Sequence, residues 1–419
     1  MVEVWLPYGK TEVHVSIPLK YLVGTIEPAV REISPNPFET VVEALRTPLD
    51  TKVLQETVEP GNKVAIALDS TMDPFLASLS AAGIAWTLNH MEVPSEDIKI
   101  IVGNGLREGS DPLMLGALQE ADALKGIEIL EHDRGSGNVA SIGATSGGTE
   151  VELSTPFIEA DARIAVGEVI PDHFAGIKGA QSTVLPSLAS FKTLEQHKEG
   201  AFQGDILPGQ YRGNPVHADQ IEACEMVGIT MALQLVTDGR GSLVSAFSGS
   251  LDSSLEKAVE ALGDSYRAPF EGEADIVVVS AGGDRFDFDL YNAIWALKAV
   301  TPMVKNGGTI IFCAECQDGL GAEGLDTLAL VDTLAELRRR YMLGAGAVYT
   351  IKSSLRNNEV IMVSALPDYL AEPLGLTVKR AANEAFQKTL QRKRGRQTLV
   401  VTHGCSIVPV KHLEGEEGD

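Results

Sequence analysis

The segment from Glu168 to Gly200 collects the residue types that bind metals and anions in proteins. It contains two histidines, His173 and His197, together with closely spaced glycines and several hydroxyl side chains, and it shows little regular periodicity. An imidazole ligates metals or transfers protons near neutral pH, and glycines let backbone N–H groups approach an anion closely. This combination indicates a metal site or a catalytic site, with hydrogen-bonded structural histidines as the alternative.

Two other motifs resemble known sites but are incomplete. The segment Gly103–Gly109 (GNGLREG) follows an expected strand and precedes an expected helix, but Glu108 stands where a dinucleotide fingerprint has its third glycine. Cys313 and Cys316 have the spacing of a zinc knuckle or a redox pair, but no second pair and no nearby pair of histidines completes four ligands. A tight strand-to-helix turn and structural cysteines are the simpler interpretations.

These motifs lie in a chain whose short β-branched runs alternate with longer amphipathic segments. Strands are expected at 63–68, 99–102, 127–130, 163–167, 275–280, 308–312, 359–365 and 398–402, and helices at 111–124, from about 290, at 326–341 and from about 377. Such alternation is typical of parallel strands joined by crossover helices. We therefore predict an α/β protein of two domains, each with a mainly parallel sheet flanked by helices, with the site in the interdomain cleft.

The expected domain boundary lies where the periodicity lapses, at residues 264–274. This boundary gives an N-terminal cofactor-binding domain of residues 1–266, a C-terminal α/β domain of residues 274–402 and a C-terminal tail of residues 403–419. The length of 419 residues agrees with two domains, because a single hydrophobic core rarely grows to that size.

The composition is that of a globular protein and excludes several classes of function. Apolar residues make up 44% and charged residues 22% of the chain, without a long low-complexity tract. The net charge of −24 repels nucleic acid and anionic membranes. The chain has no long apolar run and no secretory signal pattern, and its four scattered cysteines fit a reducing compartment. We expect a cytoplasmic protein with free thiols and with neither nucleic acid nor a membrane as partner.

The order of several short motifs along the chain resembles that of the nickel-dependent lactate racemase family. The motifs are LDST (68–71), GNG (103–105), HD (132–133), GEVIP (167–171), AG (175–176), LP (185–186), NPVHAD (214–219), GG (282–283), LYNA (290–293), GGTII (307–311) and CQDG (316–319). Each motif alone is unspecific, so the strength of the likeness lies in their order and spacing from about residue 10 to about residue 405.

The resemblance implies a nickel-pincer nucleotide as cofactor. In that family a pyridinium nucleotide holds nickel through two sulfur arms and a ring carbon, and a histidine supplies the fourth ligand. The resemblance places this metal ligand at His197, and imidazole suits nickel in a tetragonal site. It also implies transient hydride transfer from a small-molecule 2-hydroxy acid, cofactor-biosynthesis proteins as partners, and Asp69 among the catalytic residues.

Both histidine bases of that family are replaced in this chain. Arg107 stands at the first position, and its guanidinium stays protonated, so it can clamp an anion but cannot act as a base. Asp172 stands at the second position, directly after Pro171. An aspartate is a weak base unless burial raises its pKa, and His173 takes over as the catalytic residue if the loop slips by one position.

The family's cofactor-linking lysine corresponds to Ser182, ten residues after Asp172. A hydroxyl cannot reproduce the thioamide bond that a lysine forms. We therefore expect the cofactor to bind noncovalently, with its phosphate held by N–H groups and hydroxyls of Gly179–Thr183. Gly176, Lys178, Gly179, Ser182 and Thr183 form the predicted cofactor-binding set.

The predicted substrate-binding residues also differ from the family pattern. Met72 replaces an arginine, while Asn292 and Trp295, on one helix face beside Tyr291, replace a glutamine and a lysine. Loss of these cations predicts a substrate that is larger or less anionic than lactate, unless another cation of the site supplies the charge. The available cations are Arg107, Lys178 and Arg285.

We therefore predict a 2-hydroxy-acid racemase or epimerase whose substrate is not lactate. The alternative is a noncatalytic homologue that binds or carries the cofactor, because the clustered departures also fit relaxed selection at an unused site. A third possibility is a nicotinamide dehydrogenase, against which the broken glycine fingerprint argues. The sequence assigns no oligomeric state.

Overall fold

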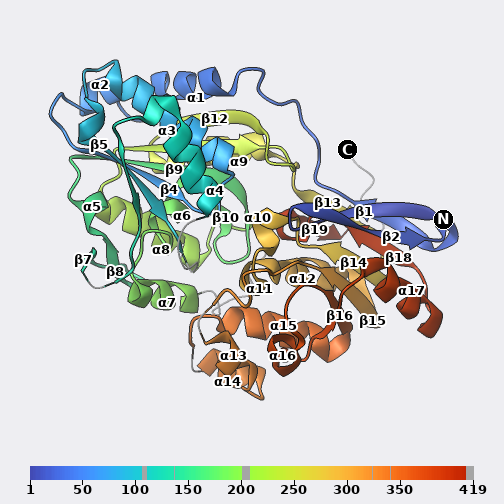
Figure 1. Cartoon of the computed structure of the whole chain (residues 1–419). Coiled ribbons are helices and arrows are strands. Elements are labelled where there is room, and N and C mark those ends of the chain that lie inside the picture. The colour runs from blue at the N-terminus through green and yellow to red at the C-terminus, as the bar shows by residue number, and fades with distance from the viewer. Residues whose placement is uncertain (106–110, 136, 201–207, 323, 340, 412–419) are drawn as a thin grey trace. The chain divides into compact units, whose positions relative to one another are not determined.

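The chain folds into two compact α/β units in the computed structural model, which describes residues 1–105, 111–135, 137–200, 208–322, 324–339 and 341–411 (Figure 1). A continuous unit comprises residues 29–265, and a split unit comprises residues 1–28 and 266–419. Each unit contains a mainly parallel sheet flanked by helices. The predicted fold class is confirmed, and the location of the site in an interdomain cleft stays a prediction.

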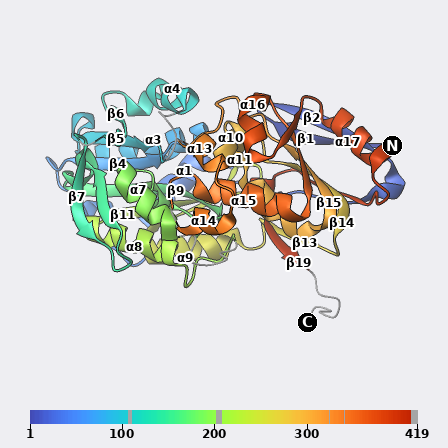
Figure 2. The same ribbon diagram turned by 90° about the horizontal axis from the view of Figure 1, so that it is seen from below.

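The continuous unit is built on a sheet with the strand order β12-β11-β9-β4-β5-β6, in which β10 also pairs with β9. Because alternate strand residues face opposite sides, Val64 and Ile66 of β4 pack with helices α1, α3 and α4, whereas Ala65 and Ala67 pack with α5, α6 and α8. Figures 1 and 2 show helices on both faces of this sheet. The elements are α1 (Pro37–Arg46), α2 (Leu54–Thr57), β4 (Val64–Asp69), α3 (Pro74–Asn89), β5 (Ile98–Gly103), α4 (Pro112–Glu120), β6 (Glu128–Glu131), β7 (Val139–Ala144), β8 (Glu150–Ser154), α5 (Thr155–Ile158), β9 (Ala162–Asp172), β10 (Gly176–Lys178), α6 (Ala180–Val184), α7 (Phe191–Glu199), α8 (Pro215–Val227), β11 (Met231–Thr237), β12 (Leu243–Gly249) and α9 (Leu251–Leu262).

The split unit has a parallel sheet with the strand order β17-β16-β15-β14-β18-β3. Ile276 and Val278 of β14 pack against the hairpin β1–β2 and helix α17 on one face. Helices α12 and α15 pack against β14 and β15 as well. The elements are β1 (Val2–Tyr8), β2 (Thr11–Ile17), β3 (Leu22–Ile26), β13 (Arg267–Phe270), β14 (Ala274–Ser280), α10 (Asp284–Asp287), α11 (Leu290–Ala293), α12 (Trp295–Val300), β15 (Val304–Cys313), α13 (Leu325–Ala329), α14 (Leu334–Arg339), α15 (Ala345–Asn357), β16 (Glu359–Val363), α16 (Asp368–Ala371), β17 (Thr377–Lys379), α17 (Ala382–Arg392), β18 (Thr398–Val401) and β19 (Val408–Lys411).

The domain composition differs from the predicted ranges at both ends of the chain. Residues 1–28 belong to the split unit and not to a domain of residues 1–266, because β3 pairs in parallel with β18 and extends the second sheet. The expected tail of residues 403–419 begins with ordered structure, since β19 pairs with β13. Both differences depend on pairing between segments far apart in sequence, which local periodicity does not reveal.

Two predicted helices of the split unit are also corrected. The expected helix at 326–341 is two helices, α13 and α14, and the hydroxyl of Thr333 accepts a hydrogen bond from the N–H of Glu336 where the second begins. The expected helix from about 377 starts later, at Ala382, because residues 377–379 form β17 at the sheet edge.

The cysteines are buried free thiols, as predicted. Burial raises the pKa of Cys313 to about 12, which keeps this thiol protonated. Among the described residues, no group of three His, Cys, Asp or Glu side chains is placed to hold a metal. Both thiols are buried at the end of β15, and the structural interpretation of Cys313 and Cys316 stays a prediction. No described helix is long and apolar enough to cross a membrane.

A buried carboxylate joins the N-terminal hairpin to the sheet of the split unit. Asp287 accepts hydrogen bonds at Oδ2 from the N–H groups of Gly9 (2.9 Å) and Glu315 (3.2 Å). Its Oδ1 is buried without a hydrogen-bond partner in the described part of the chain. Burial, reinforced by the nearby charges of Glu315 and Asp284, raises the pKa of Asp287 to about 6.

We expect Asp287→Asn to change how stability depends on pH. Because the folded-state pKa exceeds the ordinary 3.8, the stabilisation from a protonated Asp287 is fully present below pH 3.8 and is lost as the pH rises through 6. The amide cannot ionise, so at pH 8 the variant should gain roughly 1–3 kcal/mol in unfolding free energy over the wild type. Urea unfolding from pH 4 to pH 8 measures the effect. Exposed Asp332→Asn is the control, and parallel pH profiles for wild type and Asp287→Asn would contradict the prediction.

Candidate functional site

The predicted site residues of the continuous unit lie at the carboxyl ends of its central strands. Strand β4 ends at Asp69, β5 at Gly103 and β9 at Asp172. Parallel strands point the same way, so these ends meet at one edge of the sheet, which is where open α/β sheets bind ligands.

Asp69 is the most densely hydrogen-bonded carboxylate of this edge. Its Oδ1 accepts from the N–H and hydroxyl of Thr71 at 2.7 and 2.6 Å. Its Oδ2 accepts from the hydroxyl of Ser187 at 2.6 Å and pairs with the ammonium of Lys178 at 3.1 Å. Burial alone raises the pKa of Asp69, but Lys178 and the hydroxyl donors outweigh it, so that the pKa lies below its ordinary value. Asp69 is therefore a buried carboxylate.

Asp172 closes the turn between β9 and β10. Its Oδ1 accepts hydrogen bonds from the N–H groups of Phe174 (2.8 Å) and Ala175 (2.6 Å). Burial raises the pKa of this carboxyl, but the Lys198 ammonium and the backbone donors lower it by more. The pKa of Asp172 therefore lies below its ordinary value. Asp172 is thus ionised and a weak base. His173 is buried in the same turn, and its catalytic role stays a prediction.

Lys198 belongs to this group of residues but was not found from the sequence. It lies in the last turn of α7, where lysines usually face solvent and interact with the helix dipole. Here its Nζ lies 3.7 Å from the centroid of the Phe174 ring, inside the site. Burial lowers the pKa of Lys198 to about 8, although the negative charge of Asp172 acts to raise it. Its position directly after His197 was the one signal available.

His197 is held by a carboxylate in the manner of many metal-binding histidines. Its Nδ1 lies 3.0 Å from Oδ2 of Asp219, which also accepts hydrogen bonds from the hydroxyls of Thr145 and Thr149. Burial lowers the pKa of His197, so the ring is neutral. Since the ionised Asp219 can only accept, Nδ1 carries the proton and Nε2 keeps its lone pair. Nε2 has one long contact, 3.5 Å to the amide nitrogen of Gln220.

The two predicted glycines serve close packing within the protein. A Cβ on Gly176, whose φ is +82°, would lie 2.1 Å from the carbonyl oxygen of Gln210. A Cβ on Gly179 would lie within 3 Å of the side-chain oxygens of Gln181 and Gln234. Protein atoms make the close approach at both positions, and the predicted role of these glycines in cofactor binding stays a prediction.

The predicted phosphate cradle at residues 179–183 is not supported by the hydrogen bonds of that segment. The N–H of Ala180 donates to Gln234, and the hydroxyl of Thr183 donates to the carbonyl of Val166 at 2.7 Å. The hydroxyl of Ser182 points to Oε1 of Gln220 at 3.4 Å. Because these groups are buried and used inside the fold, the segment has few donors left for an anion.

The remaining predicted residues are placed as follows. Met72 is 5% exposed and packs in the apolar core above β4, which argues against its predicted contact with substrate. In the split unit, the rings of Tyr291 and Trp295 meet edge to face at 6.0 Å, and the amide of Asn292 donates to Asp289. Arg107 lies outside the described residues.

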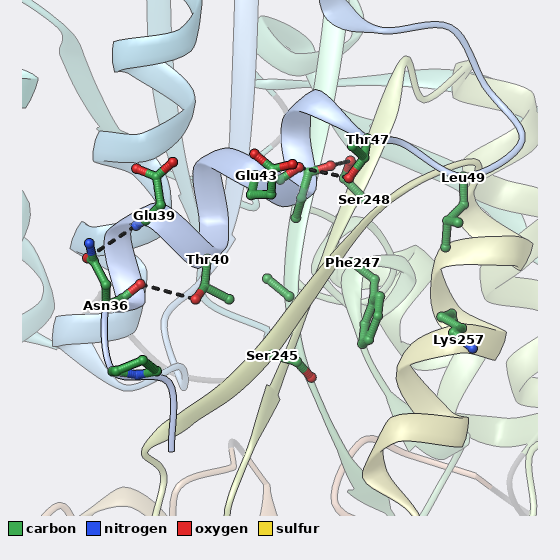
Figure 3. Close-up of a pocket in the computed structure, with 13 residues that line it drawn as sticks. Asn36, Glu39, Thr40, Glu43, Thr47, Leu49, Ser245, Phe247, Ser248 and Lys257 are labelled. Atoms are coloured by element: carbon green, nitrogen blue, oxygen red, sulfur yellow. Dashed lines mark hydrogen bonds between the residues drawn. The ribbon is translucent and has the colours of Figure 1, made fainter. Parts of the chain in front are cut away.

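A cavity with a volume of about 700 Å³ lies in the continuous unit, and none of the predicted site residues lines it (Figure 3). It lies between α1, α9 and the edge strand β12. The hydroxyls of Thr40 and Ser248 in its wall donate to backbone carbonyls of α1 and its N-cap. We therefore place the candidate site at the strand ends and not in this cavity.

Comparison with known proteins gives a consistent result for both units. Models of the lactate racemase N-terminal domain and the lactate racemase C-terminal domain match residues 8–205 and 271–409. Lactate racemase of Thermoanaerobacterium thermosaccharolyticum is 27% identical over 329 residues, which is 77% of each chain. Lactate racemase of Lactiplantibacillus plantarum is 24% identical over 425 residues, which is 97% of this chain and 100% of the relative.

Solved structures show the same similarity. The lactate racemase apoprotein from T. thermosaccharolyticum superposes with a TM-score of 0.83 at 25% identity and covers 98% of this chain and 100% of its own. A protein from Thermotoga maritima superposes with a TM-score of 0.71 at 13% identity, covers 91% of this chain and 100% of its own, and shares the fold.

The packing at the strand ends predicts that Gly167 does not tolerate a methyl group. A Cβ at Gly167 would lie 2.1 Å from the carbonyl carbon of Gly179, so Gly167→Ala should lower the free energy of unfolding by roughly 1–3 kcal/mol or more. Gly116→Ala, in open space on helix α4, is the matched control and should be neutral or stabilising by up to about 1 kcal/mol. Chemical unfolding measures both, and equal stability of the two variants would disprove the close approach.

Proposed function

The chain belongs to the lactate racemase family, and we propose that it is a racemase or epimerase of a 2-hydroxy acid other than lactate, working with a nickel-pincer nucleotide. The observation that carries this proposal is the pair His197–Asp219, in which the imidazole is neutral, its Nδ1 is fixed by the carboxylate, and its unprotonated Nε2 has one long contact of 3.5 Å to the amide nitrogen of Gln220. Metal ligands are oriented in this way by their second hydrogen bond.

The residues present fit one ligand of such a cofactor, since a single imidazole suffices when the nucleotide supplies the other three. When bound, the nucleotide would accept hydride from the α-carbon of the substrate and return it to either face. His197 would hold the metal. Because Ser182 stands where the family has its cofactor-linking lysine, the cofactor would be bound noncovalently. The donors at 179–183 are engaged elsewhere, so we assign the phosphate of the nucleotide to no residue.

The protein's own part in the reaction falls to the charged residues at the strand ends. The free oxygen of Asp172 is the acceptor that we propose for the substrate hydroxyl, because Oδ1 is already occupied by two backbone donors. Asp69 and Lys178 form a fixed pair that orients the neighbouring segments. Met72 and Trp295 stand where the family has an arginine and a lysine. These two positions therefore carry no cation, which supports a substrate other than lactate.

A noncatalytic, cofactor-binding homologue is the second candidate function. The lowered pKa of Asp172, which makes this carboxylate a weak base, favours it. Bound nickel without conversion of any 2-hydroxy acid would identify this function. Chiral chromatography of a 2-hydroxy-acid panel decides the question, and an α-deuterium label should stay in the product because hydride transfer does not exchange it with water.

We expect His197→Ala to lose the metal while the fold is kept. After co-expression with the cofactor-biosynthesis proteins and gentle purification, nickel per chain should fall to background in His197→Ala, because the one protein ligand is removed. Asp219→Asn should weaken nickel retention by about tenfold through loss of the orienting carboxylate. Elemental analysis measures both.

Exposed His90→Ala is the matched control and should keep the nickel content of the wild type. Thermal unfolding followed by circular dichroism confirms that each variant is folded. Wild-type nickel content in folded His197→Ala, or absence of nickel from the wild type, would rule out the proposed ligand.

A further inference from the structure

The ammonium of Lys198 lies in the site without a counter-ion in contact. Its Nζ lies over the Phe174 ring, and it forms no ion pair and no hydrogen bond with the described residues. The charges that act on it are those of Asp172, Lys178 and Asp69. A half-buried ammonium has lost much of its water, so it needs an anion or another acceptor for full stabilisation.

Neither neighbouring carboxylate is in ion-pair contact with Lys198. Asp69 already pairs with Lys178 at 3.1 Å and accepts from Thr71 and Ser187. Asp172 uses Oδ1 for two backbone N–H groups, and its other oxygen has no partner among the described residues. The site therefore presents one unpaired ammonium and one free carboxylate oxygen that act on each other but are not in ion-pair contact.

This arrangement is complementary to a 2-hydroxy carboxylate. Such a molecule carries an anionic group and a hydroxyl donor on adjacent carbons, which match a cation and an acceptor. The ammonium fits a carboxylate as a point charge, and the free oxygen of Asp172 fits the hydroxyl. The aromatic ring beneath Lys198 holds the ammonium in place without neutralising it.

We propose that Lys198 is the carboxylate-binding residue of this site and that it binds a 2-hydroxy acid whose hydroxyl donates to Asp172. This inference rests on the proposed function, and it names a cation that replaces those missing at Met72 and Trp295. An ammonium binds any oxyanion, so the phosphate group of a nucleotide is an alternative ligand for Lys198. The experiment tests this alternative separately.

The experiment measures anion binding to the full chain purified without cofactor. Glycolate, the smallest 2-hydroxy carboxylate, its neutral amide glycolamide and inorganic phosphate are titrated by ligand-observed NMR. The wild type should bind glycolate about tenfold or more tightly than glycolamide, and Lys198→Met should remove this preference. Lys198→Arg, which keeps the charge, should largely restore it.

Lys192→Met is the matched control on the same helix, because Lys192 is exposed and paired with Glu150; it should bind glycolate like the wild type. Folding of each variant is checked by thermal unfolding. Unchanged glycolate binding in Lys198→Met, or no glycolate binding by the wild type, would overturn the proposal. Loss of phosphate binding with glycolate binding intact would also overturn it and assign Lys198 to the nucleotide.

Nickel retention keeps this result separate from the proposed function. If the wild type fails to retain nickel, the proposed cofactor is wrong, but the glycolate titration still decides the role of Lys198. If nickel is retained and Lys198→Met keeps both nickel and the preference for glycolate, the proposed function stands and the carboxylate assignment fails.

Discussion

The carboxylate of Asp69 is the interaction on which the arrangement of the site depends. Ionised carboxylates are costly to bury unless donors surround them, and Asp69 receives two from Thr71, one from Ser187 and one from Lys178. Through these bonds the end of β4 holds both β10 and the segment after α6. The β9–β10 turn that carries Asp172 is thereby attached to the strand ends.

Fixed charges dominate this site. Asp69 and Lys178 form an ion pair in contact. Asp172 and Lys198 interact through their charges without an ion-pair contact. Where the family resemblance implies two histidines near neutral pKa, this chain has an arginine and an aspartate, and the pKa of the aspartate is depressed. A site of this kind is better suited to orienting an ionic ligand than to rapid proton transfer.

Much of the fold follows from local sequence, but the long-range pairings do not. Strands such as Val64–Asp69 are recognisable because they are buried on both faces and apolar throughout. The order of motifs along the chain indicated the family. The inward turn of Lys198 and the pairing of His197 with Asp219 on another helix depend on how α7 packs, which no local pattern records. Hydrogen bonds from α6 to strands β9 and β11 similarly use donors that the sequence had offered to an anion.

The pairing of β3 with β18 also constrains the order in which the protein matures on the ribosome. Leu22–Ile26 is synthesised before the continuous unit, whereas its partner Thr398–Val401 is synthesised after it. The continuous unit, residues 29–265, is complete long before then and can fold as a domain during synthesis. Strand β3 therefore lacks its partner strand until residues 398–401 have been synthesised, whereas the hairpin of β1 and β2 can pair within itself.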